Sequence, residues 1–151
     1  MALRTELGKA KKMIEAVLRG TGVDPDESRV TAVEGGAAWA VARGSAALMI
    51  ALNPGRTGDP GHVRMISPIV KIYNDRKLEL FERLLELNAS ELQGTAFGIA
   101  GQEVVLVSER SVRGLDRSEV EEMLAAIGYF ADQYDDLLVE EFGGIRVCDL
   151  D

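Results

Sequence analysis

The stretch DRKLELFERLLELNASELQGTAFGIAGQEVVLVSER, residues 75–110, decides the fold, because it joins a strongly amphipathic helix to a hairpin. Apolar residues in 75–92 recur at helical spacing, whereas 95–99 and 103–108 are short apolar runs on either side of a turn near residues 100–102. Asn74 or Asp75 is a natural N-cap for the helix. A helix followed at once by two hairpin strands favours an α+β fold with an antiparallel sheet.

The chain before this stretch predicts one more helix and three or four further strands. Leu7 and Ile14 belong to an apolar stripe of helical period, and Gly20 and Gly22 end that helix. Pro68 has no backbone N–H to donate, so its strand is expected to be an edge strand or to carry a bulge. The expected elements are a helix over 2–19, strands over 29–34, 37–43, 46–52 and 63–72, and an exposed Gly/Pro-rich loop over 53–62.

The chain after the hairpin predicts a long helix. Asp116 and Glu119 form a capping-box pattern at its start, the apolar positions continue to about Glu141, and the pair Gly143-Gly144 ends it. No internal repeat or linker divides the chain. We therefore expect a single α+β domain over 1–144 and a short acidic tail over 145–151.

The middle helix, 75–92, is apolar over about half of its circumference, whereas one packed face needs only a stripe of about 100°. Leu78, Phe81 and Leu85 form one cluster, and a second cluster consists of Leu80, Leu84 and Leu87. One sheet can cover only one cluster, so we expect a homodimer in which Leu78, Phe81 and Leu85 form the interface. Periodicity alone does not decide which cluster faces inward, and a deeply buried helix in a monomer is the alternative.

Composition narrows the classes of function. The net charge is -8 and 46% of the residues are hydrophobic, as in a globular protein with an acidic surface. Such a surface repels phosphate backbones and anionic lipids, so we expect neither nucleic acid nor membrane as a partner. Cys148 is the single cysteine and cannot form an internal disulfide, and the N-terminus lacks the apolar run of a signal peptide. These features predict a cytoplasmic protein.

No group of residues has the pattern of a catalytic, cofactor or metal site. His62 is the single histidine and lies in the Gly/Pro loop, where a solvated side chain is the simpler interpretation. Metal sites usually need several His or Cys ligands, and the chain has one of each. Gly55, Gly58 and Gly61 lack the Gly-Lys-Ser/Thr ending of a phosphate loop. We expect no catalytic residue, no cofactor and no bound metal.

Three segments resemble a known family. LFERLLELNASELQGTAFGIAGQEVVLVSER from Leu80, GLDRSEVEEML from Gly114 and YFADQYDDLLVEEFGG from Tyr129 are similar to the YbjN-like bacterial sensory-transduction regulators, whose domain is like the class I type III secretion chaperones. The likeness covers mainly 66–144. It implies a two-layer α-β-β-β-α-β-β-α domain, often homodimeric through the middle helix. It also implies binding of non-globular protein segments, or a regulatory role in stress responses.

Two hypotheses follow. In the first, the chain is a non-enzymatic protein-binding module whose partner contacts Leu3, Leu7, Ile14 and Trp39 on the first helix and the sheet. In the second, a small-molecule-responsive or weakly enzymatic domain has a pocket near Trp39, Arg43 and His62. The first predicts exposed apolar surface, and the second predicts a deep concave site with perturbed titratable groups.

Overall fold

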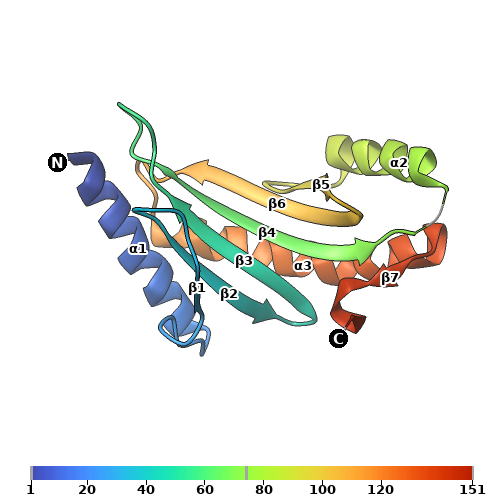
Figure 1. Ribbon diagram of the computed structural model, residues 1–151, viewed down its shortest axis with the longest axis horizontal. Coiled ribbons are helices and arrows are strands. Elements are labelled where there is room, and N and C mark those ends of the chain that lie inside the picture. The colour runs from blue at the N-terminus through green and yellow to red at the C-terminus, as the bar shows by residue number, and fades with distance from the viewer. Residues whose placement is uncertain (1, 74, 151) are drawn as a thin grey trace.

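The computed structural model describes residues 2–73 and 75–150, which form three α-helices and one antiparallel sheet (Figure 1). The helices are α1 (Ala2–Gly20), α2 (Lys77–Ser90) and α3 (Arg117–Phe142). The strands are β1 (Arg29–Val30), β2 (Ala37–Arg43), β3 (Ala46–Asn53), β4 (His62–Lys71), β5 (Ala96–Ala100), β6 (Glu103–Ser111) and β7 (Ile145–Arg146), and a short 3-10 helix, η1, spans Val147–Asp149. The α+β class with an antiparallel sheet is as predicted.

The strand order is β1-β2-β3-β4-β6-β5, and every pairing is antiparallel. Two tight turns make the hairpins possible. Gly44 joins β2 to β3 at φ 62°, and Gly101 joins β5 to β6 at φ 61°. Both angles lie in the left-handed region, where a side chain would be strained. These are the hairpins that the sequence predicted.

Several boundaries differ from the prediction. The strand expected over 29–34 pairs with β2 only at Arg29 and Val30. Asn53 and His62, expected at the ends of a loop, pair with each other and close the β3–β4 hairpin. β4 lies inside the sheet, between β3 and β6, and its pairing with β6 shifts between Pro68 and Val70. Of the two situations expected for Pro68, the structure therefore has the bulge, not the edge strand.

The helix starts show one confirmation and one correction. Asp116 accepts from the Glu119 backbone N–H at 2.9 Å, and the Glu119 side chain accepts from the Asp116 N–H, so α3 begins with the predicted capping box. In α2 the N-cap position belongs to Arg76, which makes no capping bond through its side chain. Asp75 is thus not the cap, and Asn74 lies outside the described residues.

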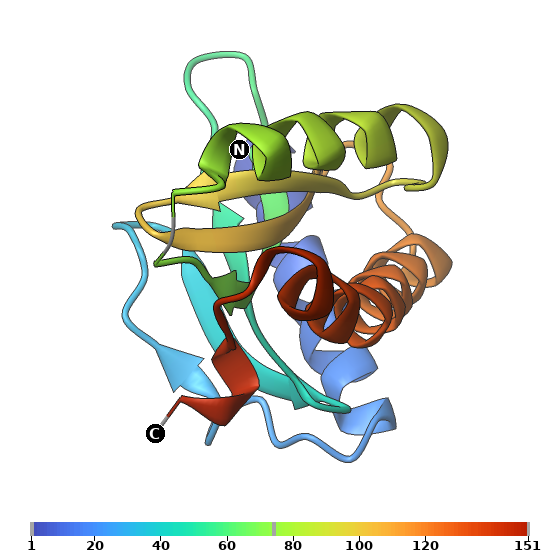
Figure 2. The same cartoon turned by 90° about the vertical axis from the view of Figure 1, so that its right-hand side faces the viewer.

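α1 and α3 lie on one side of the sheet, the right side in Figure 2, and α2 lies along the β5 edge at the top, where its buried leucines join the same core as α3. α1 and the first half of α3 cover β2, β3 and β4 around Trp39, Ile50 and Met65. α2 and the second half of α3 cover β5 and β6 around Phe97 and Leu106. No α-helix covers the opposite side of the sheet, which is the left side in Figure 2. The protein therefore has two layers, and one face of its sheet is left open.

The last residues pack against the sheet. β7 pairs with Val70 and Lys71 on the same edge of β4 as β3, at the end of β4 that β3 does not reach, and η1 follows it. Arg146 binds Asp136 of α3 through a 2.9 Å contact and Asp149 through a 2.8 Å contact. Residues 145–149, expected to be part of a tail, thus complete the end of the sheet next to α3.

Candidate peptide-binding and dimer surfaces

The middle helix α2 has two apolar faces, as the sequence predicted, and the structure separates them. Leu80, Leu84 and Leu87 are buried against the sheet and α3. On the other face Leu78 is 81% exposed and Leu85 is 69% exposed, with Phe81 at the border of the two faces. The cluster that was proposed as a dimer interface is therefore the one that faces solvent. Monomers rarely keep three large apolar side chains together in water.

Two residues expected to contact a partner lie in the protein core. Ile14 and Trp39 are both 0% exposed, because the apolar stripe of α1 packs directly onto the helix-facing side of β2. Neither offers a surface to another molecule in this structure. Leu7 is partly buried at the end of the same stripe, and the side chain of Leu3 lies outside the described residues. The prediction from amphipathic periodicity identified a core contact and not a docking face.

Trp39 is held from within the domain. The Arg29 guanidinium lies 5.3 Å from the centre of its ring, which is cation–π distance. Its indole N–H has no hydrogen-bond partner among the described residues, and an unpaired buried donor costs free energy. The ring of Trp39 is therefore part of the core, although its unpaired N–H lowers the stability of the fold, and it does not form a platform for a ligand.

The alternative pocket does not form. Trp39 and Arg43 alternate with Ala40 and Ala42 along β2, so their side chains point to the helix side of the sheet. His62 lies on β4 beside Asn53, with its Nε2 3.4 Å from Asn53 Nδ2 and 3.7 Å from a Glu109 carboxylate oxygen. In β4 the residues that face the helices are Val63 and Met65, so His62 faces the open side. The three proposed residues thus lie on opposite faces of the sheet.

The open face of the sheet carries an apolar groove of about 540 Å³ across β2, β3, β4 and β6. The strand register aligns Ala40, Met49, Ile66 and Val107 in one row across these strands. Met49, at the centre of the row, is 42% exposed, and its flexible thioether side chain adapts to differently shaped partners. The groove is lined mainly by Ala40, Ala42, Ala47, Met49, Ile66, Pro68, Ala100 and Val105, with Glu103 at its rim.

Sequence reasoning missed this groove for an identifiable reason. Residues 44–52 form the most apolar run of the chain, and a run of that length predicts a buried strand. In the structure β3 is buried only at alternate positions, and Ala47 and Met49 are exposed. The continuous apolar run of β3 could have indicated the groove, because a strand that is apolar on both faces needs a layer on each side to cover it. The three helices of the described chain supply only one layer.

An acidic cluster lies at the far end of α3. Asp135 is 5% exposed, and its carboxylate accepts the Asp136 N–H at 2.6 Å, with the Cys148 sulfur 4.0 Å from its other oxygen. Burial raises the pKa of Asp135 above its ordinary value, and the carboxylates of Asp136 and Asp132 act in the same direction. Within the described part of the chain, no three acidic, His or Cys residues are arranged to hold a metal ion.

Asp135→Asn is expected to raise the free energy of unfolding at neutral pH. A carboxyl with a raised folded pKa contributes stability below its unfolded pKa, and this contribution is lost as pH rises through the folded pKa. The amide stays neutral, so its advantage over wild type should appear at neutral pH and vanish in acid. Urea unfolding across this pH range measures the difference. A difference that does not change with pH would contradict the assignment of a raised pKa.

The described helices include none that is both long and apolar enough to cross a membrane.

The comparisons point to one class of protein. Residues 9–150 match the family model TY-Chap1, described as T3SS (YopN, CesT) and YbjN peptide-binding chaperone 1. A search of curated proteins found no match. Among solved structures, the ExsC-ExsE complex is similar with a TM-score of 0.58 and 15% identity, over 87% of this chain and 94% of that chain. The HopA1-SchA chaperone-effector complex has a TM-score of 0.57 and 12% identity, over 84% and 93%. At these identities the two likenesses concern the fold.

Proposed function

Because the chain belongs to the TY-Chap1 family of T3SS and YbjN peptide-binding chaperones, we propose that it is a non-catalytic homodimer that binds extended segments of partner proteins on its open sheet face. The observation that carries this proposal is the row Ala40, Met49, Ile66 and Val107, which lies in register across four strands and has no helix over it. A folded partner rarely presents a matching linear strip, whereas an extended chain presents apolar side chains at every second residue.

The family supports a role in holding other proteins and is not a family of enzymes. The HopA1-SchA structure pairs a chaperone with an effector protein on a similar fold, which supports a protein partner here. A regulatory role would follow from the binding itself, because a segment held by the chaperone is withheld from its other contacts. We place this function in the cytoplasm, where a lone thiol such as Cys148 stays reduced.

The proposed dimer rests on the outer face of α2. Leu78, Phe81 and Leu85 project from one side of a helix whose other side is already packed. Burying one such side chain is worth about 1.5–3 kcal/mol, and a symmetric interface buries each of them twice. The open sheet face lies away from this helix, so dimerisation through α2 would leave it available.

Met49→Glu is expected to weaken the binding of an unfolded protein about tenfold or more, because the variant buries a charge and loses an apolar contact. The probe is fluorescein-labelled ribonuclease A, reduced and carbamidomethylated so that it cannot refold, and the readout is fluorescence anisotropy. Val33→Glu is the matched control, because Val33 is 57% exposed and does not line the groove. Equal affinities of Met49→Glu and Val33→Glu for the unfolded protein would show that the open face is not the binding site.

A further inference from the structure

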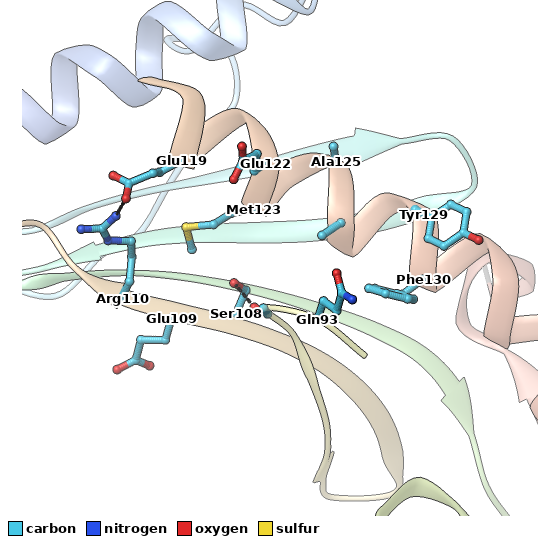
Figure 3. A pocket seen from close by; sticks show the side chains of 12 residues that line it. Gln93, Ser108, Glu109, Arg110, Glu119, Glu122, Met123, Ala125, Tyr129 and Phe130 are labelled. Atoms are coloured by element: carbon cyan, nitrogen blue, oxygen red, sulfur yellow. Dashed lines mark hydrogen bonds and ion pairs between the residues drawn. The ribbon is translucent and has the colours of Figure 1, made fainter. Parts of the chain in front are cut away.

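A second groove, of about 750 Å³, lies between β6 and α3 on the helix side of the sheet (Figure 3). Its floor is formed by Ser108 and Arg110 of β6, and its wall by residues that repeat along α3. Figure 3 shows the Met123 side chain directed towards β6, whereas Glu109 points away on the other face of the strand. The groove lies outside both the α2 face and the open sheet face. The wall consists of Glu119, Glu122, Met123, Ala125, Ala126, Tyr129 and Phe130.

The sheet is one strand short at this place. β4 pairs with β6 along its whole length to Ser111, but on the other edge of β6 the β5 ladder ends at the Ala96–Val107 pair. β6 therefore extends past β5 by the residues 108–111, and α3 runs alongside this extension. Gly94, which precedes β5, contacts the start of this extension through its C=O, which accepts the Ser108 hydroxyl at 2.8 Å.

The hydrogen-bonding direction of the edge follows from one bond. The Val112 N–H donates to the Gly61 C=O at 3.0 Å, one residue beyond the β4–β6 ladder. Backbone N–H and C=O groups alternate in direction along a strand, so those of Ser108 and Arg110 also point towards β4. The backbone N–H and C=O groups of Glu109 and Ser111 therefore point the other way, towards the edge of β6 on the β5 side. A peptide in extended form could pair with this edge as a strand pairs with a sheet.

The wall decides which peptide suits the groove. Met123, Ala126 and Phe130 follow one another at helical spacing and present an apolar strip, and Tyr129 stacks edge-to-face on Phe130 at 5.3 Å. At the other end Glu119 and Glu122 bring two carboxylates. Arg110 forms an ion pair with Glu119, and no cation among the described residues forms an ion pair with Glu122.

We propose that this groove binds an extended, lysine- or arginine-containing segment of a partner protein, added as a strand along β6 beside β5. On the side facing α3, its apolar side chains contact Met123 and Ala126, and a cationic side chain lies near Glu122. The net charge of -8 favours the same kind of partner. This inference rests on the proposed function, because it adds a second contact for the same class of ligand.

The test uses the peptide acetyl-Lys-Thr-Val-Thr-Val-Thr-Lys-amide with a fluorescein label, whose valines and lysines share one side of an extended chain. Wild type should bind it, and should bind less well the same peptide with Glu in place of Lys. Glu122→Lys should weaken the affinity about fivefold, as expected for an exposed charge contact. Ala126→Phe, which fills the groove, should abolish binding. Glu140→Lys is the control, because it makes the same change of charge on α3 outside the groove.

Strand addition should protect specific backbone amides of β6 from hydrogen exchange, and a contact through side chains alone would not. Bound peptide should slow the hydrogen exchange of the Glu109 and Ser111 amides, and leave that of the open-face residues Ala40 and Met49 unchanged. Circular dichroism checks that each variant is folded. Support requires binding that depends on Glu122 and Ala126 together with this protection.

Three results would overturn the proposal. The first is no binding of the lysine peptide to wild type. The second is binding that Met49→Glu weakens and the groove variants do not, which assigns the peptide to the open face. The third is a change of sedimentation in Ala126→Phe, which assigns the groove to a second copy of the chain. Binding of unfolded ribonuclease A is measured separately, so failure of the groove and failure of the proposed function can be told apart.

Discussion

Leu84→Asp is expected to abolish cooperative unfolding of the chain. Leu84 is 4% exposed and lies with Leu80, Phe97 and Tyr134 in the cluster that joins α2 to the sheet and to α3. Truncating a buried leucine alone costs about 2–5 kcal/mol, and an unpaired buried carboxylate adds to this cost. A domain is typically stable by about 5–15 kcal/mol, so the variant should have little or no stability left.

The measurement is urea unfolding followed by circular dichroism. Leu85→Asp is the control, because Leu85 is 69% exposed in the single chain, so the same charge there should leave the monomer folded even where it dissociates the proposed dimer. A sharp transition for Leu84→Asp near the wild-type midpoint would mean that α2 does not pack as described.

Leu85→Asp is expected to dissociate the proposed dimer while the monomer stays folded. Symmetry places the new charge in the interface twice, and loss of two buried leucines corresponds to about 3–6 kcal/mol, a weakening of a hundredfold or more. Leu78→Asp should act in the same way, because Leu78 lies on the same exposed face. Sedimentation velocity at tens of micromolar protein should give a dimer for wild type and a monomer for both variants.

The control for this result is Ser90→Asp, which adds the same charge about 140° round the helix from Leu85. Ser90 is exposed, and the hydrogen bond of its side chain among the described residues is the 2.9 Å bond to the Glu86 C=O, one turn earlier in the same helix. Ser90→Asp should remain a dimer. A wild-type monomer at the same concentration would contradict the dimer and leave the α2 face without a role.

Local patterns predicted much of the fold. The missing N–H of Pro68 left an edge strand and a bulge open, and the structure has the bulge. The capping box at Asp116 and the turn glycines Gly44 and Gly101 each depend on the chemistry of a few neighbouring residues. The two faces of α2 were visible for the same reason. Which of them turns inward depends on contacts with Phe97 and Tyr134, which are distant in sequence, so periodicity left the question open.

The binding surfaces were harder to predict. Ile14 and Trp39 looked like partner contacts because an apolar stripe on a helix or strand does not reveal what covers it. The exposed row around Met49 looked like core for the same reason, since the number of layers over a sheet is a property of the whole fold. The groove beside α3 depends on β6 being longer than β5, and the strand expected over 103–108 was too short to reveal it.

The most direct test of the central claim compares one protein in its folded and unfolded forms as a ligand for the wild-type chaperone. Native ribonuclease A and its reduced, carbamidomethylated form share their sequence and their basic side chains, so attraction to the acidic surface acts on both. Fluorescence anisotropy should detect binding of the unfolded form and little or none of the native form. Equal affinity for the two forms, or no binding of either, would contradict the proposal that this chain holds protein segments in an extended, non-globular state.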